Sequence, residues 1–496
     1  MPPQTHDIFD IEDALVTPEN PALDSYTLDY TRCARLHNYL VAYLWSAQHD
    51  WETPSSTELQ AACRKSLGEE HNLGEEYEQQ RSAIRSRLHP SLNHFIDLVY
   101  EPGKQFFYFV HDLSMELADE WILELYDEYN LEERGLERFV IIYGTVVDLG
   151  SHCVGLLYDQ ELHRATLTLV QENTDSVFPI SEHWNMWVPL ETILSHWIEL
   201  VKMKKVIAHE DEGSTPDEER MSRSQIGPWS WLSYCEKQVI DTVSAIDSYT
   251  AAIESRIPNN SLLDISRDEP LFTHADLDAA SIPTECFIRS VLTKIKTPRF
   301  KMIAPGLAVP HDKQAFITRQ KFTKLPPSQY HGELVPPVLI FASEDSSRNV
   351  PFNEELRHLF CKTRLWEETP FKEGDPVFTG LYSEPTEREA HDNEEGGFRL
   401  FLPFAFRADY RDGGARKSDG SHVSAGSFTE LFQNGGYYAF GGEHRSQRLE
   451  RLVKRWEEMI ESGVWSVGVD GVEGDIDLFR DADRGAWRDY WIAPSW

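Results

Sequence analysis

Hydrophobic residues recur three and four positions apart through most of the first half of the chain, which is the spacing of an amphipathic helix. In Val188 to Val206, for example, Ile193, Trp197 and Val201 fall on one side. Proline ends two of these patterns, at positions 90 and 258. We expect helices over Ser25 to Asp50, Ser55 to Leu67, Glu75 to Leu88, Ser91 to Tyr100, Gln105 to Asn130, Val188 to Val206 and Tyr234 to Arg256.

The pattern changes along the chain. From Gly135 to Val170 it fits either β-strands or buried helices, and both remain open. Beyond about residue 260, Pro and Gly become frequent, and Val338 to Phe341 and Phe398 to Phe406 resemble short strands. Ser446 to Ser462 predicts a final helix that ends at Gly463.

These patterns predict a mainly α-helical N-terminal region followed by an irregular α+β region. We divide the chain into an N-terminal arm (residues 1–24), a helical domain (25–260) and the irregular region (261–496). The sequence leaves open whether this last region is a separate domain or packs on the helical domain as a lid.

The amino-acid composition disfavours some classes of partner. The 496 residues include 47 Lys and Arg against 83 Asp and Glu, a net charge of −36. This charge disfavours nucleic acid and anionic membranes as partners. The longest apolar run, Phe139 to Val147, is too short to span a bilayer. Six scattered Cys and no apolar leader favour a soluble, cytoplasmic protein.

Acidic residues gather on one face of the first long predicted helix, Gln105 to Asn130. At about 100° per residue, this face holds Asp112, Glu116, Asp119, Glu120 and Asp127. No Lys or Arg lies on it, so the carboxylates would repel one another unless a cation were bound. The alternative is an ordinary solvated face, and the sequence leaves both open.

A second, smaller polar group lies on the predicted helix Tyr234 to Arg256. Asp247, Thr250 and Glu254 are spaced three and four residues apart, beside an apolar side of the same helix. Carboxylate and hydroxyl oxygens are the ligands that Mg²⁺ prefers. Two such faces held opposite each other predict a magnesium site that can hold a diphosphate. Local hydrogen bonding by the Asp and Thr side chains is the alternative.

The order and separation of the two helices, over residues 100 to 260, resemble those of class I terpene synthases. Thr250 and Glu254 match hydroxyl and carboxylate positions of that family's second motif, whereas no DDxxD is present and Asp247 stands one residue late. The similarity is therefore to non-canonical, fungal-type cyclases of secondary metabolism. It implies a magnesium-dependent lyase that ionises a prenyl diphosphate, such as farnesyl diphosphate, to a cyclic sesquiterpene.

The resemblance also implies roles for individual residues. Asp112, Glu116, Asp247 and Glu254 would be catalytic. The magnesium ligands would be Asp112, Glu116, Asp119, Glu120, Asp247, Thr250 and Glu254. Cations that contact the diphosphate would be Lys202, Lys205, Arg445 and Arg448, the last two after a Gly-rich loop. Aromatic residues such as Phe106 and Trp231 would either line the cavity or form ordinary core.

Two other functions remain open. In one, the protein has no catalytic role and its acidic surface docks a basic partner. In the other it forms peptide bonds using tRNA, which requires a basic groove that the composition does not indicate.

Overall fold

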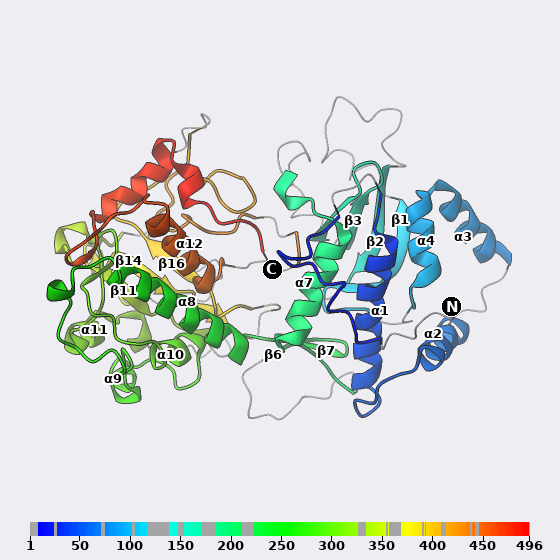
Figure 1. Ribbon diagram of the computed structural model, residues 1–496, viewed down its shortest axis with the longest axis horizontal. Helices are drawn as coiled ribbons and strands as arrows, with labels where there is room; N and C mark the ends of the chain where they lie inside the picture. Colours follow the sequence, from blue (N-terminus) through cyan, green and yellow to red (C-terminus); the bar gives the residue numbers. More distant parts are fainter. Residues whose placement is uncertain are drawn as a thin grey trace.

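The computed structural model describes most of the chain. The described residues are 8–23, 27–70, 75–101, 105–117, 138–146, 153–170, 184–210, 223–325, 334–353, 356, 369–388, 391, 393–407, 413–436, 439–441 and 446–495. They form two lobes, one from the N-terminal and one from the C-terminal half of the chain (Figure 1). Each lobe has its own large apolar core, and the second core begins at Tyr234.

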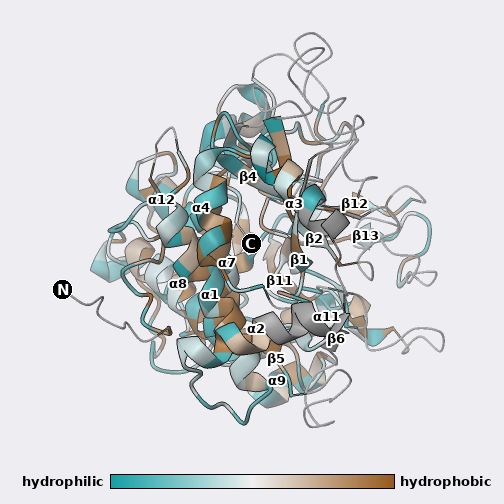
Figure 2. Ribbon diagram, turned by 90° about the vertical axis from the view of Figure 1, so that its right-hand side faces the viewer, coloured by the Kyte–Doolittle hydropathy of each residue, from teal (hydrophilic) through white to brown (hydrophobic). Residues whose placement is uncertain are grey.

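Helices of the first lobe surround α1 (Tyr30–Ala47), which packs against α7 (Leu190–Lys202) and α4 (Pro90–Leu98). The Asp29 side chain accepts a hydrogen bond from Arg32 N and begins α1. Apolar residues run along α1 and α7 where the helices lie against each other (Figure 2). The remaining helices of this lobe are α2 (Ser56–Glu70), α3 (Glu75–Arg87) and the 3-10 turn η3 (Trp184–Met186).

Two antiparallel sheets complete the first lobe. The larger has the order β1-β2-β3-β4, and the smaller has the order β5-β7-β6. The strands are β1 (Val110–Leu117), β2 (Phe139–Thr145), β3 (Cys153–Asp159), β4 (Arg164–Val170), β5 (Val206–Ala208), β6 (Arg223–Ile226) and β7 (Trp229–Leu232).

The prediction of a mainly α-helical N-terminal region is therefore wrong, and the fold is mixed. Residues 110–117 form a strand that pairs with β2, whereas the sequence analysis placed them in a helix. Strand pairing outweighs the local helical spacing because β2, the partner of β1, is rich in β-branched and aromatic residues and is largely buried. The ambiguous segment from residue 135 to 170 contributes three strands to this sheet.

The second lobe has α8 (Glu236–Glu254) packed against α12 (Leu449–Glu461), beside a seven-stranded sheet of order β16-β14-β11-β9-β8-β18-β17. Its strands are β8 (Met302–Ala304), β9 (Leu307–Ala308), β11 (Leu339–Ser343), β14 (Gly380–Ser383), β16 (Phe398–Phe401), β17 (Val467–Gly468) and β18 (Gly471–Val472). The short helices are α9 (His274–Ala279), α10 (Phe287–Leu292) and α11 (Lys313–Arg319).

Smaller elements fill the edges of this lobe. Two-stranded pairs form from β10 (Leu334–Val335) with β15 (Thr386–Glu387) and from β12 (Val350–Pro351) with β13 (Pro376–Val377). The 3-10 turns are η4 (Asn259–Ser261), η5 (Phe322–Lys324), η6 (Ser346–Arg348), η8 (Ile476–Arg484) and η9 (Trp487–Tyr490).

Helix α8 belongs to the second core, although the sequence analysis assigned it to the first domain. The residues described from the predicted N-terminal arm lie against α1. There, Arg32 donates hydrogen bonds to the carbonyl oxygens of Ala14, Leu15 and Asn20. Within the part of the chain that the structure describes, no helix is long and apolar enough to cross a membrane.

Candidate functional site

The first acidic face is only partly described, and what is described lies on a strand. Asp112 is exposed on β1, with one carboxylate oxygen 3.4 Å from Nδ1 of the neighbouring His111. Glu116 lies on the same strand, paired in register with Ile141 of β2. Asp119, Glu120 and Asp127 fall outside the described residues.

The second polar group is on α8 as predicted, but its carboxylates have partners. Glu254 is almost fully buried and accepts hydrogen bonds from the Arg299 backbone N–H at 3.0 Å and from Nη2 of the same residue at 3.0 Å. Arg267 Nη1 lies 3.6 Å from the same carboxylate. Asp247 accepts a hydrogen bond from Lys296 N at 3.2 Å, and the Thr250 hydroxyl donates to the Asp247 carbonyl oxygen at 3.1 Å. These contacts tie α8 to the segment from residue 296 to 299.

The two polar groups belong to different lobes, since β1 packs in the first core and α8 in the second. Across the described residues, no three His, Cys, Asp or Glu side chains gather in a way that could hold a metal ion. The described members of the predicted magnesium set therefore do not form a metal centre by themselves.

The predicted diphosphate-binding cations are also engaged in separate places. Lys202 pairs with Glu12 of the N-terminal segment at 2.5 Å. Lys205 is fully buried and donates to the Ser233 carbonyl oxygen at 2.8 Å. Arg448 precedes α12, with Nη1 3.7 Å from Glu450. Arg445 lies outside the described residues.

The aromatic residues proposed as cavity walls are core. Phe106 stacks on His37 with ring centroids 4.4 Å apart and on Tyr143 at 5.0 Å. Phe107 packs against Trp229 at 5.2 Å. Phe106 and Trp231, the two aromatic residues named for the cavity, are both buried in the core of the first lobe, which favours ordinary core packing.

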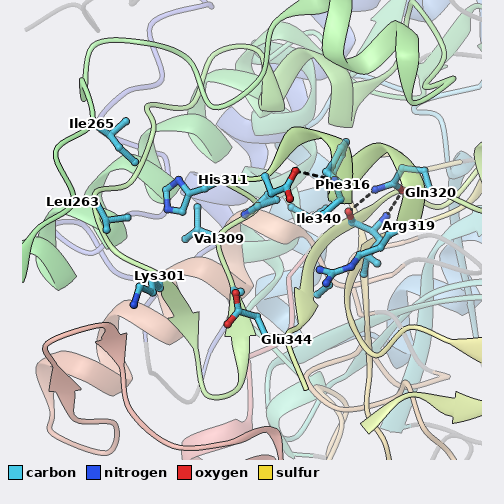
Figure 3. Close-up of a pocket in the computed structure, with 16 residues that line it drawn as sticks. Leu263, Ile265, Lys301, Val309, His311, Phe316, Arg319, Gln320, Ile340 and Glu344 are labelled. Atoms are coloured by element: carbon cyan, nitrogen blue, oxygen red, sulfur yellow. Dashed lines mark hydrogen bonds between the residues drawn. The ribbon is translucent and has the colours of Figure 1, made fainter. Parts of the chain in front are cut away.

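A different site is present in the second lobe. A pocket of about 440 Å³ lies between α11, β9 and β11 (Figure 3). Its apolar lining includes Leu263, Ile265, Val309, Phe316, Leu339 and Ile340. Its polar lining consists of Lys301, His311, Asp312, Arg319, Gln320 and Glu344.

The pocket exists because β11 is paired along only part of its length on this side. Strand β9 aligns with the last two residues of β11, with Ala308 opposite Ala342 and Leu307 opposite Ser343. Further back along β11, the Gln320 side chain takes the place of a neighbouring strand. It accepts from Leu339 N at 3.0 Å and donates to the Leu339 carbonyl oxygen at 2.9 Å. The segment between β9 and α11 therefore does not pair with β11, and it lines one side of the pocket instead.

Helix α11 is held firmly at its beginning. The Asp312 carboxylate accepts a hydrogen bond from Ala315 N at 3.0 Å and caps the helix. Lys313 donates to the carbonyl oxygens of Leu271 and Pro310. Its ammonium group also lies 4.2 Å from the ring centroid of Phe272. Burial lowers the pKa of Lys313. The helix therefore presents its last residues to the pocket from a fixed position.

Most charged groups of the pocket already have partners. Lys301 pairs with Asp470 at 2.9 Å, and the hydrogen bond between them raises the pKa of Lys301. A ring nitrogen of His311, Nε2, lies 2.8 Å from the Phe300 carbonyl oxygen, and partial burial lowers the pKa of His311.

Arg319 and Glu344 form no salt bridge with a described residue, although the negative charge of Glu344 favours the protonated forms of Lys301 and His311. Arg319 ends α11, is half-buried and lies over the Phe378 ring at 5.9 Å, without an ion pair to any described residue. Glu344 is exposed just beyond β11, and the described part of the chain gives its carboxylate no hydrogen bond. In the view of Figure 3, Glu344 lies between Lys301 and Arg319. The pocket thus offers one cation and one anion to a ligand.

The lining also limits the chemistry. Among the described residues that line the pocket there is no Ser, Thr or Cys, so a hydroxyl or thiol nucleophile beside a base is not formed there. An apolar floor with a few polar groups at its edge is typical of a binding site. The sequence did not indicate this site because its residues come from four separate stretches of the chain, none of which carries a motif of its own.

Comparison with protein-family models, with curated proteins and with solved structures finds no match to this chain.

Proposed function

We propose that this protein is a non-catalytic interaction protein whose recognition site is the pocket between α11, β9 and β11. The observation that carries the proposal is an apolar floor with two charged side chains at its edge. Arg319 forms no ion pair with a described residue, and the exposed Glu344 carboxylate accepts no hydrogen bond from one, although its charge acts on Lys301 and His311. The half-buried Arg319 guanidinium can gain a charge-assisted hydrogen bond from a bound anion.

The net charge of −36 favours a basic partner. A strongly acidic protein attracts cationic molecules over distances comparable to the Debye length, about 8 Å at physiological salt. This attraction increases the rate of encounter, while the pocket supplies the specific contacts.

The cyclase stays a prediction that no comparison tests. The geometry of α8 supports the interaction protein instead, because Glu254 is already satisfied by Arg299 and Arg267. A magnesium ion would have to displace these contacts, which leaves two guanidinium groups without their carboxylate.

A ligand screen tests the proposal. Small organic fragments would be examined by ligand-observed NMR with the unaltered protein, with Ala315→Trp, which fills the pocket, and with Ala61→Trp, an exposed site on α2. We expect a set of fragments that binds the unaltered protein and Ala61→Trp but is lost in Ala315→Trp. Binding that is identical in all three proteins would contradict the proposal.

The same preparations would be incubated with farnesyl diphosphate and magnesium. We expect no release of diphosphate above a control without protein. Release that disappears in a folded Glu254→Gln protein would overturn the proposal in favour of the cyclase.

A further inference from the structure

The geometry points to a particular occupant of the pocket: the carboxy-terminal segment of a partner polypeptide that ends in an apolar residue preceded by a basic one. This inference rests on the proposed function. The terminal carboxylate would pair with Arg319, the last side chain would lie on the apolar floor, and the preceding cation would pair with Glu344.

The carboxylate is assigned to Arg319 for two reasons. A guanidinium group presents a planar pair of N–H donors that matches a carboxylate, and such paired contacts are among the strongest hydrogen bonds. Arg319 is also half-buried on apolar surface next to Phe378, where a charged contact is less screened than in open water. The other cation of the lining, Lys301, already pairs with Asp470.

The floor fits an aliphatic or aromatic side chain. Leu263, Ile265, Val309 and Phe316 supply apolar surface, and the pocket volume of about 440 Å³ lies within the usual range for ligand sites. This space suits two or three residues of a peptide. A longer segment would continue past the edge of the pocket.

The charge of the molecule argues against a small isolated carboxylate. A bare anion is repelled by a protein of net charge −36, whereas a carboxylate that arrives with neighbouring cations is not. Glu344 provides the local partner for such a cation because it is exposed at the pocket and bears no hydrogen bond from the described residues. A basic chain terminus combines the carboxylate, the apolar side chain and the positive charge.

Calorimetric titration with short peptides tests the carboxylate contact. Acetyl-Lys-Lys-Leu would be compared as the free acid and as the carboxamide. We expect the free acid to bind about tenfold more tightly or better, since the amide loses the charge-assisted pair with Arg319. Arg319→Gln should abolish this difference. Lys321→Gln, an exposed cation two residues further on that does not line the pocket, should preserve it.

A second pair of peptides tests the role of Glu344. We expect Glu344→Gln to weaken binding of acetyl-Lys-Lys-Leu severalfold and to leave acetyl-Gly-Gly-Leu unchanged. Glu373→Gln, an exposed carboxylate away from the pocket, is the matched control and should affect neither peptide.

The possible failures are distinguishable. Equal affinity of the acid and the amide would overturn this inference while the binding role of the pocket stands. N-acetyl-leucine that binds as tightly as the tripeptide would show that a small carboxylate suffices, which also overturns it. If no peptide binds and Ala315→Trp loses no fragment, both this inference and the proposed function are wrong.

Discussion

The state of a charged side chain depends on what surrounds it, and Glu254 and Glu344 show the two extremes. Glu254 is buried on α8 and is bound by Arg299 and Arg267, so its carboxylate connects α8 to the neighbouring segments. Glu344 is exposed at a pocket and accepts no hydrogen bond from the described residues. Of the two carboxylates, only that of Glu344 is accessible to another molecule.

Removal of the Glu254 charge should therefore destabilise the protein. For Glu254→Gln we expect a loss of about 2 kcal/mol in the free energy of unfolding, less than for a fully buried pair because both guanidinium partners are about a third exposed. Urea denaturation measures this loss. Asp241→Asn, whose partner is the exposed Lys237, should change stability by less than about 0.5 kcal/mol.

The stability of Glu254→Gln also tests whether Glu254 is a magnesium ligand. If Glu254→Gln kept full stability and lost a magnesium-dependent stabilisation by pyrophosphate, the carboxylate would be a metal ligand and the structural role would be wrong.

His37 gives the first lobe a dependence on pH. It is fully buried between the Tyr143 hydroxyl, 2.7 Å from Nδ1, and the Tyr100 carbonyl oxygen, 2.8 Å from Nε2. Burial lowers its pKa from 6.5 to about 4. The folded state then binds fewer protons than the unfolded state, so stability is greatest above pH 6.5 and falls as the pH decreases toward 4.

We expect His37 alone to cost about 1.4 kcal/mol of stability between about pH 7.5 and about pH 5.5. Denaturation curves at the two pH values would be compared with those of His37→Gln, which lacks the titrating group. The pH dependence of His37→Gln should be smaller by that amount. An equal pH dependence in both proteins would contradict the burial of a neutral imidazole.

At the scale of elements, regular helices with a clear apolar side were predictable. Helix α7 lies within Val188 to Val206, α8 within Tyr234 to Arg256 and α12 within Ser446 to Ser462. Each has enough buried apolar residues at helical spacing to specify its own structure.

Strand β1 was not predictable in the same way. Asp112 and Glu116 are four residues apart, and this spacing brings side chains to the same face of a helix and of a regular strand. The acidic spacing therefore could not distinguish the two structures. Pairing with β2, a contact between segments far apart in the chain, decided the outcome.

The pocket depends on another long-range contact, which can be tested. Gln320 pairs with the backbone of Leu339 and holds the end of α11 against β11. In Gln320→Leu, the Leu339 amide and carbonyl lose these bonds, and unsatisfied buried groups cost about 1 to 3 kcal/mol each. We expect faster hydrogen exchange at Leu339 and loss of ligand binding at the pocket.

Gln314→Leu on the same helix is the matched control, because its side chain is exposed and makes no hydrogen bond with the described residues. It should leave hydrogen exchange at Leu339 unchanged. Unaltered exchange in Gln320→Leu as well would show that the side-chain bridge does not maintain the pocket.

At the scale of the molecule, the two lobes meet at a buried polar junction. Lys205 Nζ lies 3.0 Å from Glu394 Oε2, an ionic contact that lacks the alignment of a hydrogen bond, and 4.8 Å from the Trp231 ring centroid. Trp231 in turn donates to the Asn393 carbonyl oxygen at 2.5 Å. Lys205 belongs to the first lobe, and residues 393 and 394 lie between strands of the second.

Lys205→Met should leave Glu394 buried without its cation and destabilise the junction by about 3 to 5 kcal/mol. The double variant Lys205→Met/Glu394→Gln should recover part of this loss, because the uncompensated charge is gone. Thermal denaturation of the single and double variants measures the coupling. A single variant as stable as the unaltered protein would show that the ion pair does not hold the lobes together.

The most direct test of the whole account compares the two candidate sites in one titration. The ligand that binds most tightly would be titrated calorimetrically into the unaltered protein, into Ala315→Trp at the pocket and into folded Glu254→Gln on α8. We predict that Ala315→Trp abolishes binding and that Glu254→Gln keeps the original affinity. Binding that survives in Ala315→Trp and disappears in Glu254→Gln would contradict the account and return the function to the acidic faces.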